Sequence, residues 1–191
     1  MTLQAKPSDK ITYDNVEYNF HPYYNRVLTL LSEVFPSKDM TDGQKIEITV
    51  SSLSDAPPSQ GTFELIVHEL FPPKKKEASD KKTMDFEQDA ALIYAAFLQT
   101  YNIDLYAVRN NMDWRIFIAL LKGIPENTEL SRVIKLRGMK IPERNKSNSE
   151  YVDSLIKAKR AVELDEPIEV KKQRMAKKWL QIAEGLTNVR R

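Results

Sequence analysis

The sequence predicts a mainly α-helical protein: a compact bundle of short helices with a small N-terminal β-hairpin and a C-terminal amphipathic helix. Three observations lead to this prediction. Apolar residues recur at spacings of three and four in several stretches, which is typical of helices with one buried face. Only 5 glycines occur in 191 residues, which disfavours a turn-rich β-sandwich. One short stretch near the N-terminus places alternating apolar residues about a two-residue turn.

The N-terminal region, residues 1–73, is expected to hold the hairpin and several helices. Residues 11–20 carry apolar side chains on both sides of Asp14-Asn15, the pattern of two strands joined by a tight turn. An isolated hairpin is marginally stable in water, so this one is expected to lie against helices. A helix is then predicted over residues 24–35.

Residues 40–53 allow two interpretations. The isoleucines and valine of this stretch alternate as in a strand, whereas Thr41 and Gln44 have the spacing of a capping box at a helix start. We favour the helix, because Ile46, Val50 and Leu53 fit one helix face.

A further helix is predicted over residues 63–70 and should stop at Pro72-Pro73. Residues 74–84, KKKEASDKKTM, then form a charged connector. The connector's lysines could contact phosphates. However, Glu77 and Asp80 dilute them and no aromatic residue is interleaved, so a solvated loop is the better interpretation.

The densest apolar pattern lies in residues 85–138, which are expected to form a central core of three short helices. Asp85 is the expected N-cap of the first helix, with Gln88 three places on as in a capping box. Asn102 is expected to end this helix because asparagine tolerates the left-handed conformation. The predicted buried face of the helix comprises Phe86, Ala90, Ile93, Tyr94, Phe97, Leu98 and Tyr101.

Two more helices are predicted within the central core. Gly123 followed by Pro125 should end the second helix, because this order is common after a last helical turn. Thr128 is expected to cap the third helix, which should run to Arg137. The apolar stripe of the second helix comprises Trp114, Phe117, Ile118 and Leu121.

The C-terminal extension, residues 139–191, is predicted to carry two helices as an appendage to one globular domain. Ser147 and Glu150 have capping-box spacing at the start of the first helix, which should run to Leu164. The second helix should begin at residues 165–167, since acids and proline suit a helix start. This last helix is basic and amphipathic, so it either docks on a partner or a membrane surface or packs on its own domain.

Composition excludes several classes of function. The net charge of +2 is too small for a general nucleic-acid binder. The absence of cysteine excludes disulfides, cysteine-ligated metal sites and a thiol nucleophile. No stretch approaches the roughly 20 apolar residues that a membrane span needs, and no N-terminal signal segment is seen. A cytoplasmic protein is therefore expected.

No catalytic, metal or cofactor site is predicted, and the protein is not expected to be an enzyme. His21 and His68 stand in unrelated contexts with no acid pair at ligand spacing, which argues against a metal site. The sequence contains no nucleophile elbow, phosphate-binding loop or dinucleotide fingerprint. Asp104 and Asp113, near turns, are better explained as caps than as general bases.

A set of spaced residues in the central core carries a resemblance to a known family. In their order and spacing, the sequence resembles the tail assembly chaperone family of long-tailed phages (siphophages) of Gram-positive bacteria, the bacteriophage "gene product fifteen" type. A weaker echo covers residues 10–35. The residues that carry the resemblance are Asp89, Leu92, Ile93, Tyr94, Phe97, Tyr101, Ile103, Asp104, Leu105, Trp114, Phe117, Leu120, Leu121, Leu136 and Arg137.

The resemblance implies a non-enzymatic function in viral tail morphogenesis. Members of such a family bind the tape measure protein, keep it soluble in the host cytoplasm and hold it ready for the major tail tube protein to polymerise around it. They are then displaced and are absent from the mature virion. The expected partners are therefore the tape measure protein, the major tail tube protein, a frameshifted longer form and further copies of the chain, but no membrane and no nucleic acid.

The residues expected to contact a partner combine aromatic side chains with apolar and basic neighbours, because tryptophan is enriched at interface hot spots. They are Trp114, Phe117, Lys177, Lys178, Trp179 and Leu180. Each aromatic also has a packing explanation, because large apolar side chains dominate protein cores. Two alternative functions stay open: a structural virion protein such as a head–tail connector, and a small nucleic-acid-binding phage regulator that uses the basic C-terminal helix.

Overall fold

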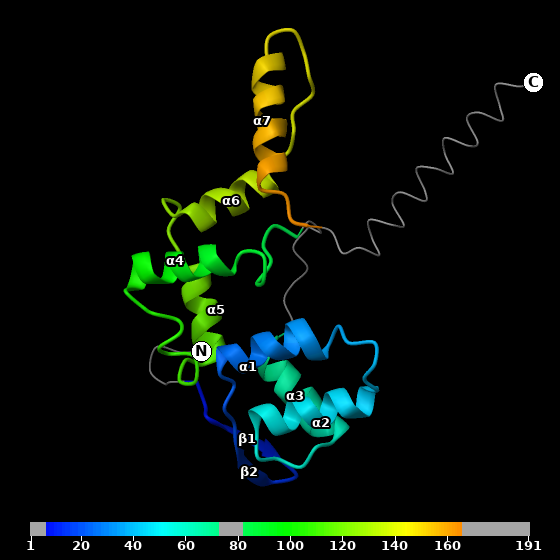
Figure 1. Ribbon diagram of the computed structural model, residues 1–191. Coiled ribbons are helices and arrows are strands. Elements are labelled where there is room, and N and C mark those ends of the chain that lie inside the picture. The colour runs from blue at the N-terminus through cyan, green and yellow to red at the C-terminus, as the bar shows by residue number, and fades with distance from the viewer. Residues whose placement is uncertain (1–6, 73–81, 166–191) are drawn as a thin grey trace, which may run out of the picture. The chain divides into compact units, whose positions relative to one another are not determined.

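The computed structural model describes residues 7–72 and 82–165, and within them it confirms the mainly helical prediction (Figure 1). These residues form seven α-helices, one π-helix and a two-stranded antiparallel hairpin. Close contacts divide the chain into two compact units, Met1–Gly138 and Met139–Arg191. The amphipathic helix expected to begin at residue 165 falls almost entirely outside the described residues.

In the first unit, the elements are β1 (Lys10–Tyr13), β2 (Val16–Asn19), α1 (Tyr24–Thr29), η1 (Leu30–Val34), α2 (Asp42–Leu53), α3 (Gln60–Leu70), α4 (Ala90–Tyr101), α5 (Trp114–Lys122) and α6 (Glu129–Gly138). The described part of the second unit contributes α7 (Ser149–Ala161).

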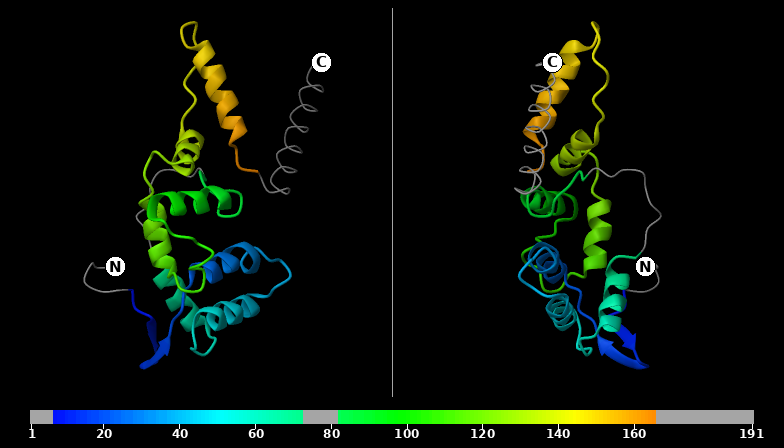
Figure 2. Two further views of the ribbon diagram at one scale, coloured as in Figure 1. Left: turned by 60° about the vertical axis from the view of Figure 1, so that its left-hand side comes forward. Right: turned by 90° about the vertical axis from the view of Figure 1, so that its right-hand side faces the viewer.

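The N-terminal hairpin forms at the predicted turn. Asp14 and Asn15 have φ angles of 49° and 62°, and a two-residue hairpin turn of type I′ requires positive φ at both positions. β1 lies beside α3 (Figure 2). A Cβ atom on Gly61 of α3 would approach Cε2 of Tyr13 to 2.8 Å, so glycine at this position lets the tyrosine ring pack on the helix.

The helix predicted over residues 24–35 divides into α1 and the π-helical turn η1. The N–H of Phe35 donates to the carbonyl of Leu30, five residues back, at 2.9 Å, which closes the wider turn. Leu30 and Val34 are both buried. The helical run stops before Pro36, because proline has no N–H to continue it.

In the ambiguous stretch 40–53, residues Asp42–Leu53 form the helix α2, and its capping box is complete. The Thr41 hydroxyl accepts the N–H of Gln44 at 3.3 Å, and the Gln44 side chain accepts the N–H of Thr41 at 2.9 Å. The next helix, α3, begins earlier than predicted. Ser59 caps α3 by accepting the N–H of Thr62 at 3.1 Å, and this cap fixes its first turn.

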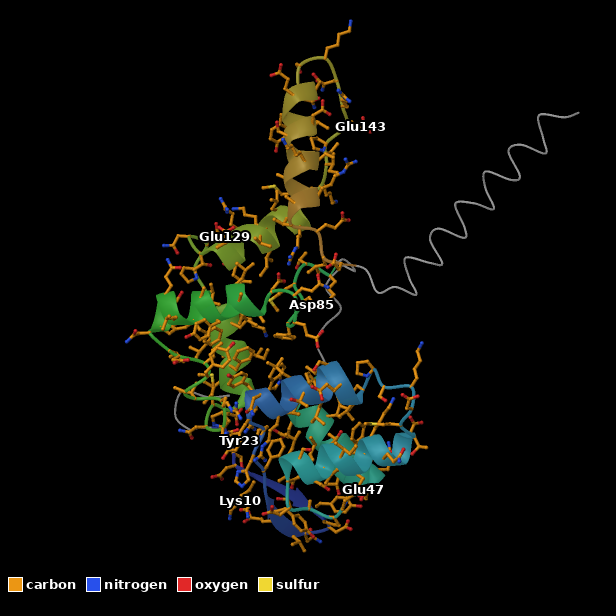
Figure 3. All side chains as sticks on the ribbon, in the orientation of Figure 1. Lys10, Tyr23, Glu47, Asp85, Glu129 and Glu143 are labelled. Atoms are coloured by element: carbon orange, nitrogen blue, oxygen red, sulfur yellow. The ribbon has the colours of Figure 1, made fainter. Side chains whose placement is uncertain are left out.

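The central helix α4 begins later than the sequence predicts. The Asp85 carboxylate accepts the N–H groups of Glu87 and Gln88 at 2.9 and 3.0 Å, but these bonds close a turn that precedes the helix (Figure 3). The N-cap position belongs to Asp89, and its carboxylate accepts the N–H of Asp85 at 2.9 Å. The helix itself starts at Ala90.

The far end of α4 matches the prediction, whereas its buried side does so only in part. Asn102 ends the helix in the left-handed conformation, with φ of 53°. Ile93 and Phe97 are buried as expected, but Ala90 and Leu98, which were predicted on the buried face, are exposed. The helix itself carries apolar side chains on every side, so their spacing alone does not identify the side that faces the core.

Both α5 and α6 begin at their predicted caps. The Asp113 carboxylate accepts the N–H of Arg115 at 2.7 Å, and the Thr128 hydroxyl accepts the N–H of Ser131 at 3.3 Å. α5 ends at its C-cap, Gly123.

The N-terminal and central segments share one core in the first unit. The Phe117 ring stacks on Tyr24 with ring centroids 4.8 Å apart and on Phe97 with centroids 5.1 Å apart, so α5 joins α1 to α4. A backbone bond supports this junction, because the N–H of Trp114 donates to the carbonyl of Pro22 at 2.7 Å.

In the second unit, α7 does not begin with the predicted pairing of Ser147 and Glu150. The hydroxyl and the N–H of Ser147 both donate to the Asn145 side chain at 2.9 Å, so Ser147 belongs to a turn that precedes the helix. The Lys159 ammonium donates to the carbonyl of Met139 at 2.6 Å, which ties the stretch before α7 to the helix.

Candidate partner-binding surface

The outer side of α4 is unusual for a surface helix because α4 contains no charged residue. Its twelve residues are AALIYAAFLQTY. Ile93, Ala96 and Phe97 turn into the core. Ala91, Tyr94, Ala95 and Leu98 lie on another side at spacings of three and four, and we call these four residues the α4 outer face.

The α4 outer face is open to solvent in the described chain. Ala91 and Ala95 are exposed, Tyr94 is half-buried and Leu98 is 42% exposed. A surface helix normally carries charged or polar residues on its solvent side, and an apolar solvent side is typical of a surface that another molecule covers.

Tyr106, in the turn between α4 and α5, enlarges this apolar surface. Its side chain is 73% exposed, and its ring centroid lies 5.1 Å from that of Tyr94. The Asp104 carboxylate accepts the N–H groups of Tyr106 and Ala107 at 2.9 and 3.4 Å, so this predicted cap orders the turn that holds Tyr106 beside α4. Partial burial raises the pKa of the Tyr94 hydroxyl, and the nearby Asp104 carboxylate adds to the shift.

An ion pair fixes the start of α4. Arg137 of α6 donates from Nη1 and Nη2 to the two carboxylate oxygens of Asp89, at 2.6 and 2.9 Å. The Asp89 side chain is 2% exposed and that of Arg137 is 10% exposed. Nη1 of Arg137 also donates to the carbonyl of Thr83 at 3.1 Å. α6 therefore holds in place both the turn that leads into α4 and the N-cap residue of that helix.

Other exposed apolar side chains in the described part of the first unit are more scattered. Val16, Leu65 and Phe71 are 49%, 39% and 39% exposed, and each lies on a different element or turn. By contrast, Tyr94, Leu98 and Tyr106 gather at one place. The α4 outer face with Tyr106 is therefore the best candidate for a partner-binding surface in this unit.

Two of the contact residues predicted from the sequence, Trp114 and Phe117, lie in the core and are 3% and 1% exposed. Trp114 packs between Phe71 and Phe86, with ring centroids 5.9 and 5.8 Å away. The structure therefore agrees with the packing explanation for both residues. Contact of either with a partner stays a prediction, and it requires the core to open.

The other four predicted contact residues, Lys177, Lys178, Trp179 and Leu180, lie outside the described residues. The structure thus tests none of the four. Sequence reasoning missed the α4 outer face. The signal that could have found it is the absence of charge over the twelve residues of α4, a stretch too short to span a membrane.

Within residues 7–72 and 82–165, no group of three or more histidine, aspartate or glutamate side chains is placed to hold a metal ion. No helix in these ranges is long and apolar enough to cross a membrane.

Comparison with known proteins places this chain in a viral context. A family model described as Bacteriophage Gp15 protein matches residues 7–164. The matched range begins just before β1 and ends just after α7, so it takes in the N-terminal hairpin as well as the central helices. No curated protein and no solved structure matches the chain.

Proposed function

Because this chain belongs to the Bacteriophage Gp15 protein family, we propose that it is a phage tail assembly chaperone. In this proposal the protein binds the tape measure protein in the host cytoplasm, keeps it soluble and promotes polymerisation of the tail tube around it. The protein acts by binding alone, without catalysis, and leaves before the virion is mature.

The single structural observation that supports this proposal is the uncharged outer face of α4. A long helical partner such as a tape measure protein exposes apolar side chains until the tube covers them, and it needs an apolar surface to shield them. Ala91 and Ala95 are small, so the axis of a partner helix can approach α4 closely, towards the lower end of the usual 8–10 Å separation. Tyr94 and Leu98 flank these alanines and provide the larger contacts.

The size of this surface suits a contact that has to be broken again. A helix of twelve residues is about 18 Å long, so one side of it buries far less than the roughly 800 Å² per partner of a stable interface. A single contact of this size is expected to be weak. Many copies of the chain, each bound weakly, would together cover one tape measure protein. Tube subunits could then displace these copies one at a time.

The major tail tube protein is the expected competitor in this scheme, and a frameshifted longer form of the chain is an expected companion. Trp179 and Leu180, with Lys177 and Lys178 beside them, are proposed as further partner contacts on the C-terminal segment.

Co-expression of the full chain with the tape measure protein of the same phage tests the proposal. The expected result is that the tape measure protein stays soluble in company, precipitates alone and co-purifies with the chain. A tape measure protein that is equally soluble alone, with nothing retained on the chain, would overturn the proposal.

A further inference from the structure

We propose that, in the free protein, the α4 outer face packs against the α4 outer face of a second copy as an antiparallel helix pair. The pairing itself is inferred from α4 alone. Its consequence, competition between the second copy and the tape measure protein for one face, rests on the proposed function.

The spacing of the four residues in the α4 outer face is the same in both directions. Its members are separated by three, one and three residues, so an antiparallel pair about a twofold axis brings Ala91 opposite Leu98 of the partner subunit. The same register brings Tyr94 opposite Ala95 of the partner subunit. Each large side chain therefore meets a small one, which is the arrangement that lets two helix surfaces interdigitate.

Charge does not oppose this pairing. A twofold axis brings identical surfaces together, so a face that carries charge of one sign would repel its own copy. α4 has no charged residue from Ala90 to Tyr101. A second copy is therefore tolerated where a face of one sign would reject it.

The small size of the face sets the expected strength. Four residues of one helix and Tyr106 fall well short of the 20–30 residues a side that a stable interface uses. We therefore expect a dimer that forms in the range of tens to hundreds of micromolar and dissociates on dilution.

A reversible dimer would protect the same surface that the proposed function uses. While the tape measure protein is absent, each copy covers the apolar face of the other. The tape measure protein has to displace the second copy to bind, and any helix with a similar apolar side would compete in the same way.

Sedimentation equilibrium of the full chain over about 5 to 500 μM tests the pairing. The wild type should shift with concentration from the 22.1 kDa monomer towards the dimer. Leu98→Glu, at a side chain that is 42% exposed, should weaken the association at least tenfold while it keeps the thermal melt of the wild type. Leu65→Glu is the matched control, because Leu65 is 39% exposed on a different helix, and it should associate as the wild type does.

Cysteine cross-linking tests the register, since the chain has no cysteine of its own. A mixture of Ala91→Cys and Leu98→Cys proteins should form a covalent dimer on mild oxidation. Neither variant alone should do so to the same extent, because positions on the two copies that are not opposite each other lie beyond disulfide reach.

Three results would overturn the proposal: a monomer at every concentration, association that Leu98→Glu leaves unchanged, or cross-linking of a single variant that equals that of the mixture. A wild type that stays monomeric and still retains the tape measure protein would overturn the pairing alone. A wild type that dimerises but retains no tape measure protein would support the pairing and overturn the proposed function.

Discussion

Arg137 and Asp89 lie 48 residues apart in the sequence and form a two-pronged ion pair, with N–O distances of 2.6 and 2.9 Å. Both side chains are almost fully buried. The pair joins the last turn of α6 to the N-cap of α4. Because Asp89 also accepts the N–H of Asp85, the pair fixes the turn before α4 as well as the direction of the helix. The α4 outer face thus has its orientation set by a contact from α6.

Removal of either partner of this pair should strongly destabilise the fold. Asp89→Ala leaves the Arg137 guanidinium buried without its carboxylate partner. Arg137→Met leaves the Asp89 carboxylate buried without its guanidinium partner. Each is expected to lower the free energy of unfolding by about 3 kcal/mol or more. Urea denaturation measures the loss, and the double variant should lose clearly less than the sum of the two single losses.

Arg132→Met is the matched control on the same helix. Arg132 pairs with Glu129 at 2.7 Å, but its side chain is 75% exposed, so solvent screens the pair and little change in stability is expected. Equal losses for Arg132→Met and Arg137→Met would contradict the structural role given to the buried pair.

Phe117 should be essential to the core because its ring contacts aromatic rings from α1 and α4. Phe117→Ala is expected to lower the free energy of unfolding by about 3–5 kcal/mol, through lost burial and the cavity left behind. Tyr106→Ala, at a side chain that is 73% exposed, should leave thermal unfolding nearly unchanged. A mild effect of Phe117→Ala would place the ring at a surface instead, where the sequence had also allowed it.

Asp85 should make stability depend on pH. The Lys82 ammonium beside it, and next the N–H groups of Gln88 and Glu87, hold the pKa of the Asp85 carboxyl below its ordinary value of 3.8. The charged form is therefore favoured in the folded state. Its contribution is complete above this ordinary pKa, which applies to the unfolded chain, and is lost as the pH falls through the lower folded-state pKa.

The corresponding measurement compares the wild type with Asp85→Asn in urea denaturation between pH 7 and pH 2.5. The stability advantage of the wild type should be constant down to about pH 5 and should shrink below about pH 4. An advantage that stays constant to pH 2.5 would show that the charge of Asp85 does not contribute to folding.

Trp179 is predicted from the sequence to contact a partner. Trp179→Ala should then weaken retention of the tape measure protein in a pull-down and leave the cooperative thermal melt of the chain intact. Loss of the cooperative melt in this variant would mean that Trp179 packs in a core.

Several parts of the fold could be predicted because their signals are local. The hairpin turn at Asp14-Asn15, the capping box of Thr41 with Gln44 and the left-handed stop at Asn102 each depend on residues within a few positions of one another. The side chains of such a segment already favour its conformation, and tertiary contacts then stabilise that conformation.

Other parts could not be predicted, because they depend on partners far away in the sequence. The late start of α4 is one example. Asp85 has the sequence signature of a cap, but the N-cap position goes to Asp89, which Arg137 holds from 48 residues away. Spacing within 85–101 contains no information about that contact.

The candidate surface was missed for a related reason. Spacing placed Leu98 on the buried face of its helix, yet Leu98 is exposed. A helix that is apolar on all sides gives no contrast between faces, so only the packed structure shows which side stays open. Trp114 and Phe117 were chosen from the sequence as partner contacts, but both side chains are buried. The residue types that suit an interface also suit a core, so residue type alone did not separate the two.

Co-purification of surface variants tests whether the α4 outer face binds the tape measure protein. The full chain, Leu98→Glu and Leu65→Glu are each co-expressed with the tape measure protein, and the retained amount is quantified after purification, with thermal melts to show that all three are folded. The wild type and Leu65→Glu are expected to retain the tape measure protein, whereas Leu98→Glu is expected to lose it. Equal retention by all three folded proteins would show that the tape measure protein does not bind through the α4 outer face.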